Sequence, residues 1–375
     1  MNIGFDAKRF YHNHTGLGNY SRDVVKAIIS EYPANEYFLY TPSISDSPKV
    51  DFLRESNNVQ IVTPNGVFKK LTSVWRTYFM ANNIRKKNIN VYHGLSNEIP
   101  RQKYKGKTKY VVTIHDLIFL RFPKTYPWID RVIYTRKVMY AISKADKIIA
   151  ISEQTKRDLM LFFEVEEHRI EVVYQACDNS FMNLISKEKK SQLRERYSLP
   201  DKYLLSVGTL EERKNALLCL KALKSVDELP LLLIGKSTSY KKELDRFIEK
   251  NQLVDRVIFL ENVPFTDLPG LYQMATVFLY PSRFEGFGIP ILEALYSATP
   301  VIAATGSSLE EVGGVGSIYI SSDDENELAM QINSVLGSEE LRNKMIEEGL
   351  SHAASFTSEN QAKALEKVYR GLLSN

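Results

Sequence analysis

The segment FEGFGIPILEA, residues 284–294, decides how this sequence is interpreted. It follows the short apolar run VFLY, residues 277–280, and it leads into a stretch with helical spacing. Gly286 and Gly288 leave room for a ligand to approach the backbone closely. The start of a helix offers free N–H groups and the positive end of a dipole, and Pro290 suits its first turn. The segment therefore predicts a strand–loop–helix connection that binds a diphosphate.

Two glutamates belong to this connection. Glu285 lies on the loop, and Glu293 lies about one turn into the expected helix, on the same side of the site. Carboxylates near a phosphate site make sense if each accepts hydrogen bonds from sugar hydroxyls, one set from a transferred sugar and one from a nucleotide ribose. The alternative is an ordinary strand–loop–helix connection with two surface glutamates.

A second segment, SVGTLEERKN at residues 206–215, has a similar arrangement. An apolar strand ends in Gly208, and a basic pair precedes the next helical stretch. Arg213 can direct two N–H groups onto phosphate oxygens, and Lys214 adds a compact positive charge. Together they would neutralise a leaving diphosphate without a metal ion. The alternative is a solvated basic pair that forms salt bridges with Glu211 and Glu212.

Short apolar runs alternate with longer amphipathic stretches along almost the whole chain. This alternation predicts parallel sheets that helices cover on both faces. Strands are expected at residues 3–6, 37–40, 59–62, 91–94, 110–115 and 147–151, and then at 203–207, 231–234, 257–260, 277–280, 301–303 and 317–320. Helices are expected, for example, at residues 20–32, 67–87, 215–225, 240–251, 268–274, 290–297, 308–312 and 324–336. The fold class is therefore α/β, and both segments described above lie at strand ends, where ligands of such sheets bind.

The strand pattern stops between the two halves, which predicts two separate sheets. CDNS at residues 177–180 is typical of a turn, and residues 185–197 are typical of a charged helix. The boundary is expected near residues 178–186, with an N-terminal Rossmann-like domain at 1–182 and a C-terminal one at 183–355. Residues 356–375 contain a final amphipathic helical stretch, at 359–373.

The N-terminal half offers weaker signals. Gly16 and Gly18 follow the first strand and precede a helix, as in a phosphate-binding loop, although an ordinary turn would look the same. His115 ends an apolar strand, where a side chain can reach a ligand cleft. A lone histidine is nevertheless more often structural than catalytic, and His93 is a similar case.

Length and composition suit a soluble protein of two domains. The 375 residues are 44% hydrophobic and 25% charged. Cys177 and Cys219 give neither a metal-binding spacing nor a disulfide framework, which favours a reducing compartment. The first residues are typical of a strand rather than a signal peptide, and no apolar run approaches the roughly 20 residues that span a bilayer. We therefore expect a cytoplasmic protein.

Charge is distributed unequally. Residues 1–180 hold 27 basic and 18 acidic side chains, a net charge of +9, whereas the remainder holds 22 and 27, a net charge of −5. A basic N-terminal half favours an anionic partner, such as a membrane surface or a phosphorylated acceptor, although scattered lysines would also serve solubility alone. No basic and aromatic recognition module supports a nucleic-acid partner.

Several chemistries lack their motifs in this sequence. There is no Gly-x-Ser-x-Gly nucleophile elbow and no Gly-x-x-x-x-Gly-Lys-Ser/Thr phosphate loop. No His-Glu-x-x-His or Cys-x-x-Cys pattern for zinc is present. The acidic run at residues 323–325 is expected to cap a helix rather than to bind a metal. We therefore expect no metal ion and no other cofactor.

These motifs together resemble family 4 of the retaining glycosyltransferases, which have the two-domain GT-B architecture. Glu285 and Glu293, eight positions apart, match the Glu-x₇-Glu motif of that family, and residues 207–215 match its diphosphate-binding loop. Further similarity lies at residues 113–117, 151–159 and 299–303, and the likeness extends from Gly16 to about residue 336. The sequence is most similar to a bacterial branch that includes mannosyltransferases of surface-polysaccharide assembly. That branch usually has proline where Glu212 stands.

The resemblance implies a retaining, metal-independent transfer from a nucleotide-sugar, for which branch similarity favours GDP-mannose. Arg213 and Lys214 would hold the diphosphate next to Gly208. Glu285 would hold the hydroxyls of the transferred sugar, and Glu293 would bind the ribose. The backbone N–H groups of the glycine loop would assist Glu285, namely those of Gly286, Phe287 and Gly288.

The resemblance also implies roles for the N-terminal domain, which would bind the acceptor. Gly16 would let the N-terminal loop approach the diphosphate, and His115 would contact the sugar near its anomeric carbon. The two domains would enclose a deep cleft that excludes water on closure, and the C-terminal helix would cross back onto the N-terminal domain.

The acceptor is expected to be a glycan or a lipid-linked sugar at the inner face of the cytoplasmic membrane. Residues 68–79 combine apolar residues at helical spacing with basic ones, and residues 101–109 carry Arg or Lys at every second position. Basic amphipathic surfaces bind anionic lipid. For Trp75, packing into the core of the domain is the favoured alternative.

Two other classes of protein remain as alternatives. A nucleotide-sugar epimerase with the same fold would convert the donor without any acceptor. A sugar-nucleotide-binding protein without catalysis would bind the donor and show no turnover. A phosphorylase would be longer and would carry a pyridoxal lysine.

Overall fold

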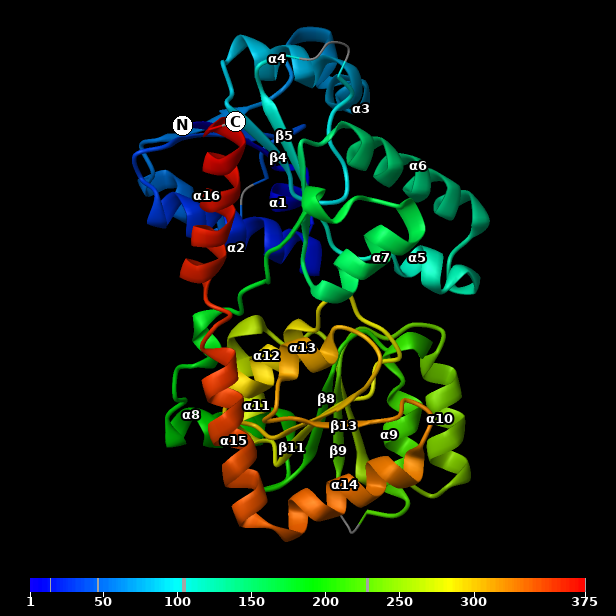
Figure 1. The fold of residues 1–375 in the computed structure, drawn as a ribbon. Coiled ribbons are helices and arrows are strands. Elements are labelled where there is room, and N and C mark those ends of the chain that lie inside the picture. The colour runs from blue at the N-terminus through cyan, green and yellow to red at the C-terminus, as the bar shows by residue number, and fades with distance from the viewer. Residues whose placement is uncertain (14, 46, 103–105, 227–228, 375) are drawn as a thin grey trace. The chain divides into compact units, whose positions relative to one another are not determined.

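The chain forms two α/β units, each built around its own parallel sheet (Figure 1). The structure is a computed structural model that describes residues 1–13, 15–45, 47–102, 106–226 and 229–374. The first unit comprises Met1–Ala176 together with Phe356–Asn375, and the second comprises Cys177–Ser355. Among the helices of the described residues, none is both long enough and apolar enough to cross a bilayer.

The first unit contains a seven-stranded parallel sheet in the order β3-β2-β1-β4-β5-β6-β7. Its strands are β1 (Asn2–Asp6), β2 (Glu36–Tyr40), β3 (Val59–Val62), β4 (Val91–Gly94), β5 (Lys109–Ile114), β6 (Lys147–Ala150) and β7 (Ile170–Val172). The main helices are α1 (Lys8–His12), α2 (Gly16–Glu31), α5 (Ile118–Arg121), α6 (Trp128–Lys144), α7 (Glu153–Phe163) and α16 (Ser358–Ser374). The chain reverses its direction of travel across the sheet between β1 and β4, so ligand-binding loops are expected beside those strand ends.

The second unit contains a six-stranded parallel sheet in the order β10-β9-β8-β11-β12-β13. Its strands are β8 (Leu204–Val207), β9 (Leu231–Ile234), β10 (Val257–Leu260), β11 (Val277–Tyr280), β12 (Val301–Ala304) and β13 (Ile318–Ile320). Its helices are α8 (Lys187–Tyr197), α9 (Ala216–Leu223), α10 (Lys241–Lys250), α11 (Leu268–Met274), α12 (Ile289–Tyr296), α13 (Leu309–Gly313), α14 (Glu325–Gly337) and α15 (Glu339–Ala353). The predicted α/β class with two parallel sheets is confirmed. The acidic run at 323–325 also caps α14 as predicted, because the Asp324 carboxylate accepts the N–H groups of Asn326 and Glu327.

The helix predicted over residues 67–87 is wrong as a single element. The chain instead forms a 3₁₀ turn (Gly66–Lys69), the short helix α3 (Thr72–Val74), a π-helical turn (Trp75–Phe79) and α4 (Met80–Lys86). The π-turn inserts one extra residue, so Trp75 and Met80 both face the core, where they are buried. Trp75 thus packs into the core of the first unit, which was the favoured alternative to membrane contact.

The two units divide at Ala176, six residues before the boundary expected at 182. Residues 179–181 form a 3₁₀ turn that packs on α11 and α12 of the second unit. The ring of Phe181 is buried there, edge-on to Phe265 and Tyr272, with ring centroids 5.6 Å apart in both cases. A turn was predicted at residues 177–180, and this aromatic cluster places it in the second unit.

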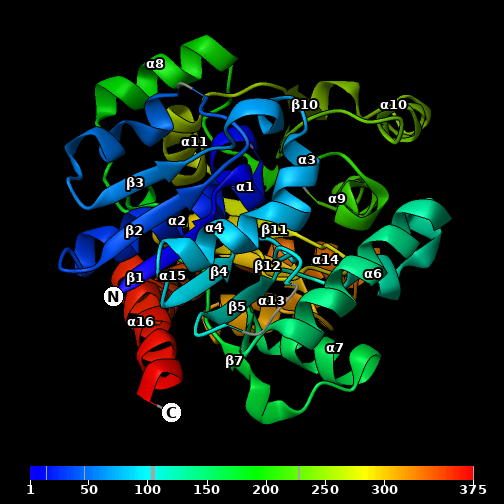
Figure 2. The same cartoon turned by 90° about the horizontal axis from the view of Figure 1, so that it is seen from above.

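The C-terminal helix α16 returns to the first unit and packs along α2 (Figures 1 and 2). Its Tyr369 hydroxyl lies 2.6 Å from Nδ1 of His93 on β4, and Nε2 of His93 lies 2.8 Å from the Thr113 hydroxyl on β5. All three side chains are buried. Burial lowers the pKa of His93 to about 3, so the imidazole is neutral at pH 7 and serves to fix α16 on the sheet.

Replacing Tyr369 with Phe should destabilise the protein by about 1–3 kcal/mol, because it leaves a buried imidazole nitrogen without its partner. Urea denaturation measures this loss. Tyr134→Phe is the matched control, since Tyr134 is 43% exposed and its ring contact with Phe119 is kept in the variant. Equal stabilities of the two variants would contradict the anchoring role of His93.

Candidate active site

The loop at residues 281–288 connects the carboxyl end of β11 to α12. Gly288 is the N-cap of α12 and has φ of 115°, a backbone conformation that favours glycine. A Cβ atom there would also approach Leu309 to 2.9 Å. Ser308 fixes the loop from the other side, because its hydroxyl donates to the carbonyl oxygens of Glu285 and Phe287 at 2.9 and 2.7 Å. The loop is therefore pre-shaped by its tertiary contacts.

Glu285 lies at the centre of a charged cluster. Its Oε1 is 2.8 Å from Nη1 of Arg213 and 2.6 Å from Nζ of Lys214. The Ser282 and Tyr280 hydroxyls donate to the same oxygen at 2.7 and 3.2 Å. The structure thus brings together three residues that the sequence placed in separate motifs.

Both cations of this cluster are held in a buried environment. The Arg213 side chain is 17% exposed and that of Lys214 is 19% exposed. Arg213 also contacts Glu211 at 2.5 Å and donates to the Phe284 carbonyl at 2.6 Å. The Lys214 ammonium lies 5.0 Å from the centroid of the Tyr280 ring. The alternative is therefore wrong in treating the basic pair as solvated, although the salt bridge that it expected between Arg213 and Glu211 is present.

The charges of the cluster reinforce one another. Burial opposes ionisation of Glu285, but Lys214 and Arg213 outweigh it and lower the pKa of this carboxyl to about 2. Burial likewise disfavours the charged forms of Arg213 and Lys214, and the carboxylate of Glu285 outweighs it and raises the pKa of both. All three groups are charged at neutral pH. Two cations therefore lie at the carboxyl ends of the strands, where they could bind the negative charge of a diphosphate.

Asn215 holds the loop that carries the two cations. It adopts a left-handed backbone conformation, φ 60°, between a 3₁₀ turn (Glu212–Lys214) and α9. Its buried side-chain amide donates to the carbonyl oxygens of Pro281 and Ser322 at 3.1 and 2.8 Å. The two loops are further joined by the Arg283 N–H, which donates to the Arg213 carbonyl at 2.9 Å. These hydrogen bonds between the loops that follow β8 and β11 fix the positions of Arg213 and Lys214.

Gly208, at the end of β8, lies close to the same cations. A Cβ atom on Gly208 would lie 3.6 Å from the Lys214 side chain. Its carbonyl oxygen also lies against Gly235, where a Cβ atom would come within 1.9 Å of it. The backbones that follow β8 and β9 are therefore in direct contact at Gly208 and Gly235.

Glu293 occupies a separate position on α12. It is only partly exposed, and the Tyr272 hydroxyl donates to its Oε2 at 2.8 Å. Burial raises the pKa of Glu293 to about 7, although the hydrogen bond from Tyr272 opposes the shift. Glu293 thus differs from Glu285, which is paired with two cations and fully ionised. The alternative of two surface glutamates is wrong, because Glu285 is buried and Glu293 is only partly exposed.

The two predicted residues of the first unit have different surroundings. His115 follows β5 and is buried, and its Nε2 lies 2.8 Å from the Leu95 carbonyl. Because a carbonyl only accepts, Nε2 carries the proton and Nδ1 is the acceptor. Burial lowers the pKa of His115 to about 4, so the ring is neutral at pH 7. Gly16 opens α2, with no atom within 4 Å of a Cβ placed on it, whereas a Cβ on Gly18 would collide with the Asn13 carbonyl.

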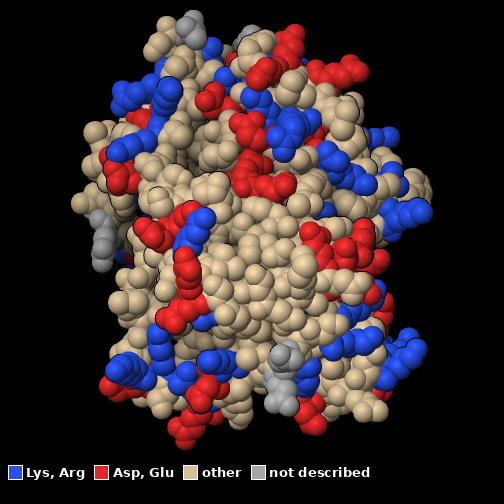
Figure 3. Space-filling model, turned by 60° about the horizontal axis from the view of Figure 1, so that its bottom comes forward, with Lys and Arg blue, Asp and Glu red and all other residues tan. Residues whose placement is uncertain are grey.

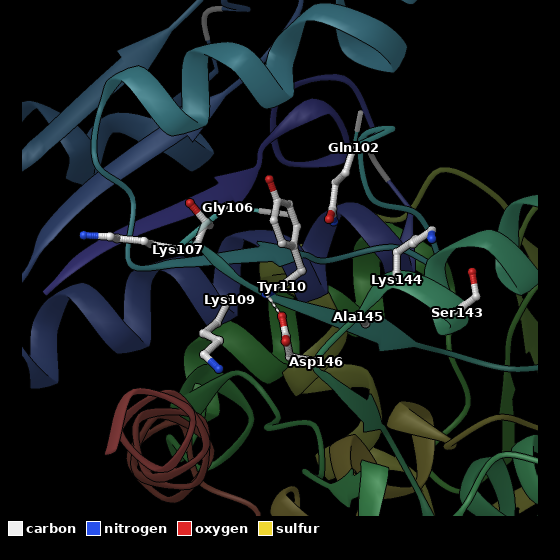
Figure 4. A pocket seen from close by; sticks show the side chains of 10 residues that line it. Gln102, Gly106, Lys107, Lys109, Tyr110, Ser143, Lys144, Ala145 and Asp146 are labelled. Atoms are coloured by element: carbon white, nitrogen blue, oxygen red, sulfur yellow. Dashed lines mark hydrogen bonds between the residues drawn. The ribbon is translucent and has the colours of Figure 1, made fainter. Parts of the chain in front are cut away.

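The lysine run at residues 101–109 lies only partly within the described chain. Lys103 and Lys105 lie outside the described residues. Lys107 and Lys109 line a pocket of about 570 Å³ at the amino end of β5, together with Lys144. Figure 4 shows that these three side chains diverge, and that Asp146 accepts the Tyr110 N–H, at 2.7 Å. The basic groups therefore do not converge on one anion.

Sequence reasoning missed the residues that hold the site in place. Tyr272, Tyr280, Ser282 and Ser308 all contact the loop or its glutamates, yet each is an ordinary residue in its own stretch of sequence. Only the position of Tyr280 at the end of an apolar strand offered a signal. Within the described ranges, no group of three or more His, Cys, Asp or Glu side chains comes together as a metal site.

Two family models account for most of the chain. The model for family 4 glycosyltransferases matches residues 15–181, and the model for group 1 glycosyl transferases matches residues 186–352. The chain is a family 4 glycosyltransferase. The resemblance seen in its motifs is therefore confirmed, and the protein is an enzyme that transfers a glycosyl group.

Relatives of known name are similar over much of this glycosyltransferase. The O-antigen chain mannosyltransferase B of Escherichia coli is 27% identical, over 99% of this chain and 100% of its own. The O-antigen chain mannosyltransferase RfbU of Salmonella typhimurium is 28% identical over 60% of both chains. The D-inositol 3-phosphate glycosyltransferase of Corynebacterium diphtheriae is 25% identical over 61% of this chain and 56% of its own.

Solved structures share the fold of the whole chain. Anabaena HepE, in a complex with UDP and glucose, superposes with a TM-score of 0.77 at 18% identity, over 99% of this chain and 100% of its own. WaaG, a glycosyltransferase involved in lipopolysaccharide biosynthesis, gives a TM-score of 0.70 at 16% identity over the same shares. The GT-B architecture expected from the sequence is confirmed.

The raised pKa of Glu293 predicts a pH dependence of nucleotide binding, if this carboxylate accepts ribose hydroxyls. Because the folded protein favours the protonated acid up to pH 7, its stability without nucleotide should fall as the pH rises from about 4.5 to 7. Nucleotide, by contrast, should bind about tenfold more tightly at pH 8 than at pH 6, since only the ionised form accepts both hydroxyls.

Calorimetric titration with a nucleoside diphosphate at the two pH values measures this effect. Glu293→Gln should remove the pH dependence, whereas Glu347→Gln, an exposed glutamate on α15, should retain it. Retention of the full pH dependence in Glu293→Gln would show that another group titrates.

Proposed function

We propose that this glycosyltransferase moves mannose from GDP-mannose, with retention of anomeric configuration, to a glycan or lipid-linked acceptor in cell-surface polysaccharide synthesis. The observation that carries the proposal is the cluster of Arg213, Lys214 and Glu285 at the neighbouring ends of β8 and β11. The sugar is proposed from the relatives, since two whose names specify mannosyl transfer in O-antigen chains are 27% and 28% identical.

The two cations would stabilise the leaving diphosphate. As the bond to the sugar breaks, negative charge develops on the diphosphate oxygens, and preorganised donors there act in a water-poor site. Arg213 can donate two hydrogen bonds, and the ammonium of Lys214 adds a point charge. Losing one donor of this kind typically lowers the rate by about 10²–10³-fold. We therefore propose that Arg213 and Lys214 stabilise the leaving diphosphate without a divalent metal.

The remaining residues would orient the donor. Glu285, which is ionised and fixed by Ser282, would accept hydroxyls of the transferred sugar, and Glu293 would accept those of the ribose. The backbone of Gly286, Phe287 and Gly288 lies at the start of α12, where a helix dipole favours negative charge. In the first unit, His115 would offer Nδ1 to the sugar, and Gly16 at the start of α2 would face the diphosphate.

A pocket of the first unit is proposed to take the acceptor. It has a volume of about 190 Å³ and lies beside the carboxyl ends of β1 and β4. Arg76 bridges Asp6 at 2.5 Å and Glu98 at 2.9 Å, and Lys137 lies 3.1 Å from Glu98. Burial opposes ionisation of Glu98, but Arg76 and Lys137 outweigh it and lower its pKa to about 2. Such an ionised, hydrogen-bonding lining suits a glycan.

We further propose that the enzyme works at the inner face of the cytoplasmic membrane and contacts its anionic lipids through the first unit.

A thermal-shift panel of GDP-, UDP- and ADP-sugars in the presence of EDTA tests the donor assignment. GDP-mannose should raise the melting temperature, because a ligand that binds only the folded state stabilises it. Lys214→Ala should abolish the rise, whereas Lys242→Ala, an exposed lysine on α10, should preserve it.

Each other outcome has a defined meaning. Stabilisation by UDP- or ADP-sugars alone would overturn the GDP-mannose assignment and keep the site. A shift that persists in Lys214→Ala would remove the diphosphate role of the cluster. Conversion of the donor without any acceptor would identify an epimerase instead.

A further inference from the structure

The helix α6 presents an apolar face to solvent along its first three turns. Trp128 is 70% exposed, Ile129 is 54% exposed and Met139 is 53% exposed, and Val132 and Ile133 are exposed as well. The opposite face carries the contacts with the rest of the unit, through the buried residues Val138, Ala141 and Ile142. A surface helix normally turns its apolar stripe inward. In α6, apolar residues occupy both faces. Packing into the core accounts for the inner residues but not for the exposed ones.

A second apolar strip lies next to α6. The segment at residues 67–79 exposes apolar side chains on its outer side, namely Val67, Leu71, Val74, Tyr78 and Phe79. Arg101 joins the two, because its guanidinium lies 5.4 Å from the Tyr78 ring and 5.9 Å from the Tyr140 ring of α6. The Arg101 N–H also donates to the Thr77 carbonyl at 2.9 Å. We call the exposed residues of 67–79 and 128–140, with Arg101, the α3–α6 surface.

The charges on this surface are almost all positive. No Asp or Glu occurs between Glu55 and Glu98 in the sequence, and Asp130 is the single acidic residue of α6. Basic side chains are interspersed with the apolar ones, namely Lys69, Lys70, Arg101, Arg131 and Arg136, whereas Lys137 is paired with Glu98 at 3.1 Å. The face shown in Figure 3 carries acidic side chains among the basic ones. The α3–α6 surface therefore combines an apolar area with a positive potential.

A shallow apolar pocket on α6 adds to this pattern. It has a volume of about 290 Å³ and is lined by Trp128, Val132 and Thr135 together with Arg131 and Arg136. Its lining places guanidinium groups beside an exposed indole and an aliphatic side chain. Tryptophan prefers the level of the lipid headgroups, while Arg and Lys contact phosphates there. An acyl chain with an anionic headgroup matches both halves of this lining.

We infer that the α3–α6 surface docks on an anionic lipid bilayer, with Trp128 and Ile129 inserted at the headgroup level and the basic side chains on the lipid phosphates. The inference rests on the proposed function at the membrane and specifies the surface that makes the contact. The surface continues into the proposed acceptor pocket, because Arg101, Arg136 and Tyr140 line that pocket as well. Docking in this orientation would bring the headgroup of a lipid-linked acceptor to the strand ends of the first unit.

Vesicle binding by the full chain tests the inference. Sedimentation with vesicles of equal parts phosphatidylglycerol and phosphatidylcholine should recover the protein, whereas pure phosphatidylcholine vesicles should bind it far more weakly. Ile129→Ser with Val132→Ser should weaken binding by about tenfold or more, since two apolar side chains no longer enter the bilayer. Lys69→Ala with Arg131→Ala, one residue from each segment, should weaken it by about 25-fold, at about fivefold for each basic residue.

Matched controls come from the second unit. Leu184→Ser with Val315→Ser removes two apolar side chains that are even more exposed, and Lys224→Ala with Lys242→Ala removes two exposed lysines. Both pairs should leave vesicle binding unchanged. All variants should keep their thermal stabilisation by nucleotide, which shows that they fold and separates this test from that of the proposed function.

Tryptophan fluorescence locates the contact. The protein has two tryptophans, and Trp75 is buried while Trp128 is exposed. Anionic vesicles should shift the emission to shorter wavelength in the wild type but not in Trp128→Tyr. The inference would be overturned if vesicles left the emission of the wild type unchanged, or if both α3–α6 variants bound vesicles as the wild type does. It would also be overturned if the protein self-associated without vesicles and the same substitutions abolished that self-association.

Discussion

The ion cluster of Glu285 with Arg213 and Lys214 is the interaction on which the rest of the site depends. It joins loops from β8 and β11, two adjacent strands where the chain changes direction across the sheet. Buried charges are tolerated only when they are paired, so each member needs the others to remain ionised. A bound diphosphate would supply further negative charge to the same cations. The cluster therefore explains how the two loops are held together and how they are prepared for an anionic donor.

Much of the fold could be predicted because parallel strands buried on both faces appear as short apolar runs. The runs at 231–234, 257–260 and 277–280 coincide with β9, β10 and β11. The glutamates and the basic pair could also be found, since their motifs are local. Their pairing could not, because Lys214 and Glu285 are far apart in sequence and meet only through the sheet. Asn215 and Ser308 hold the loops by contacts that no local pattern reveals.

The sequence was least informative where apolar residues face outward. Helical spacing at 67–87 predicted one regular helix, whereas a π-turn there directs Trp75 and Met80 inward and leaves Tyr78 and Phe79 exposed. In α6, the apolar residues fall on both faces, so periodicity gives no clear stripe to distinguish a core helix from a docking surface. The division between the units falls just before the expected range of 178–186, because Phe181 packs into an aromatic cluster that is assembled only in the fold.

The central claim is that Arg213 and Lys214 bind the diphosphate of the donor. The most direct measurement compares the dissociation constants of GDP and GMP, without metal, in the wild type and in Lys214→Met. Hydrogen bonds to charged groups contribute about 1.5–3 kcal/mol, so GDP should bind the wild type at least about tenfold more tightly than GMP. The advantage should largely disappear in the variant. Equal affinities of GDP and GMP for the wild type, or an advantage unchanged by the substitution, would contradict the account.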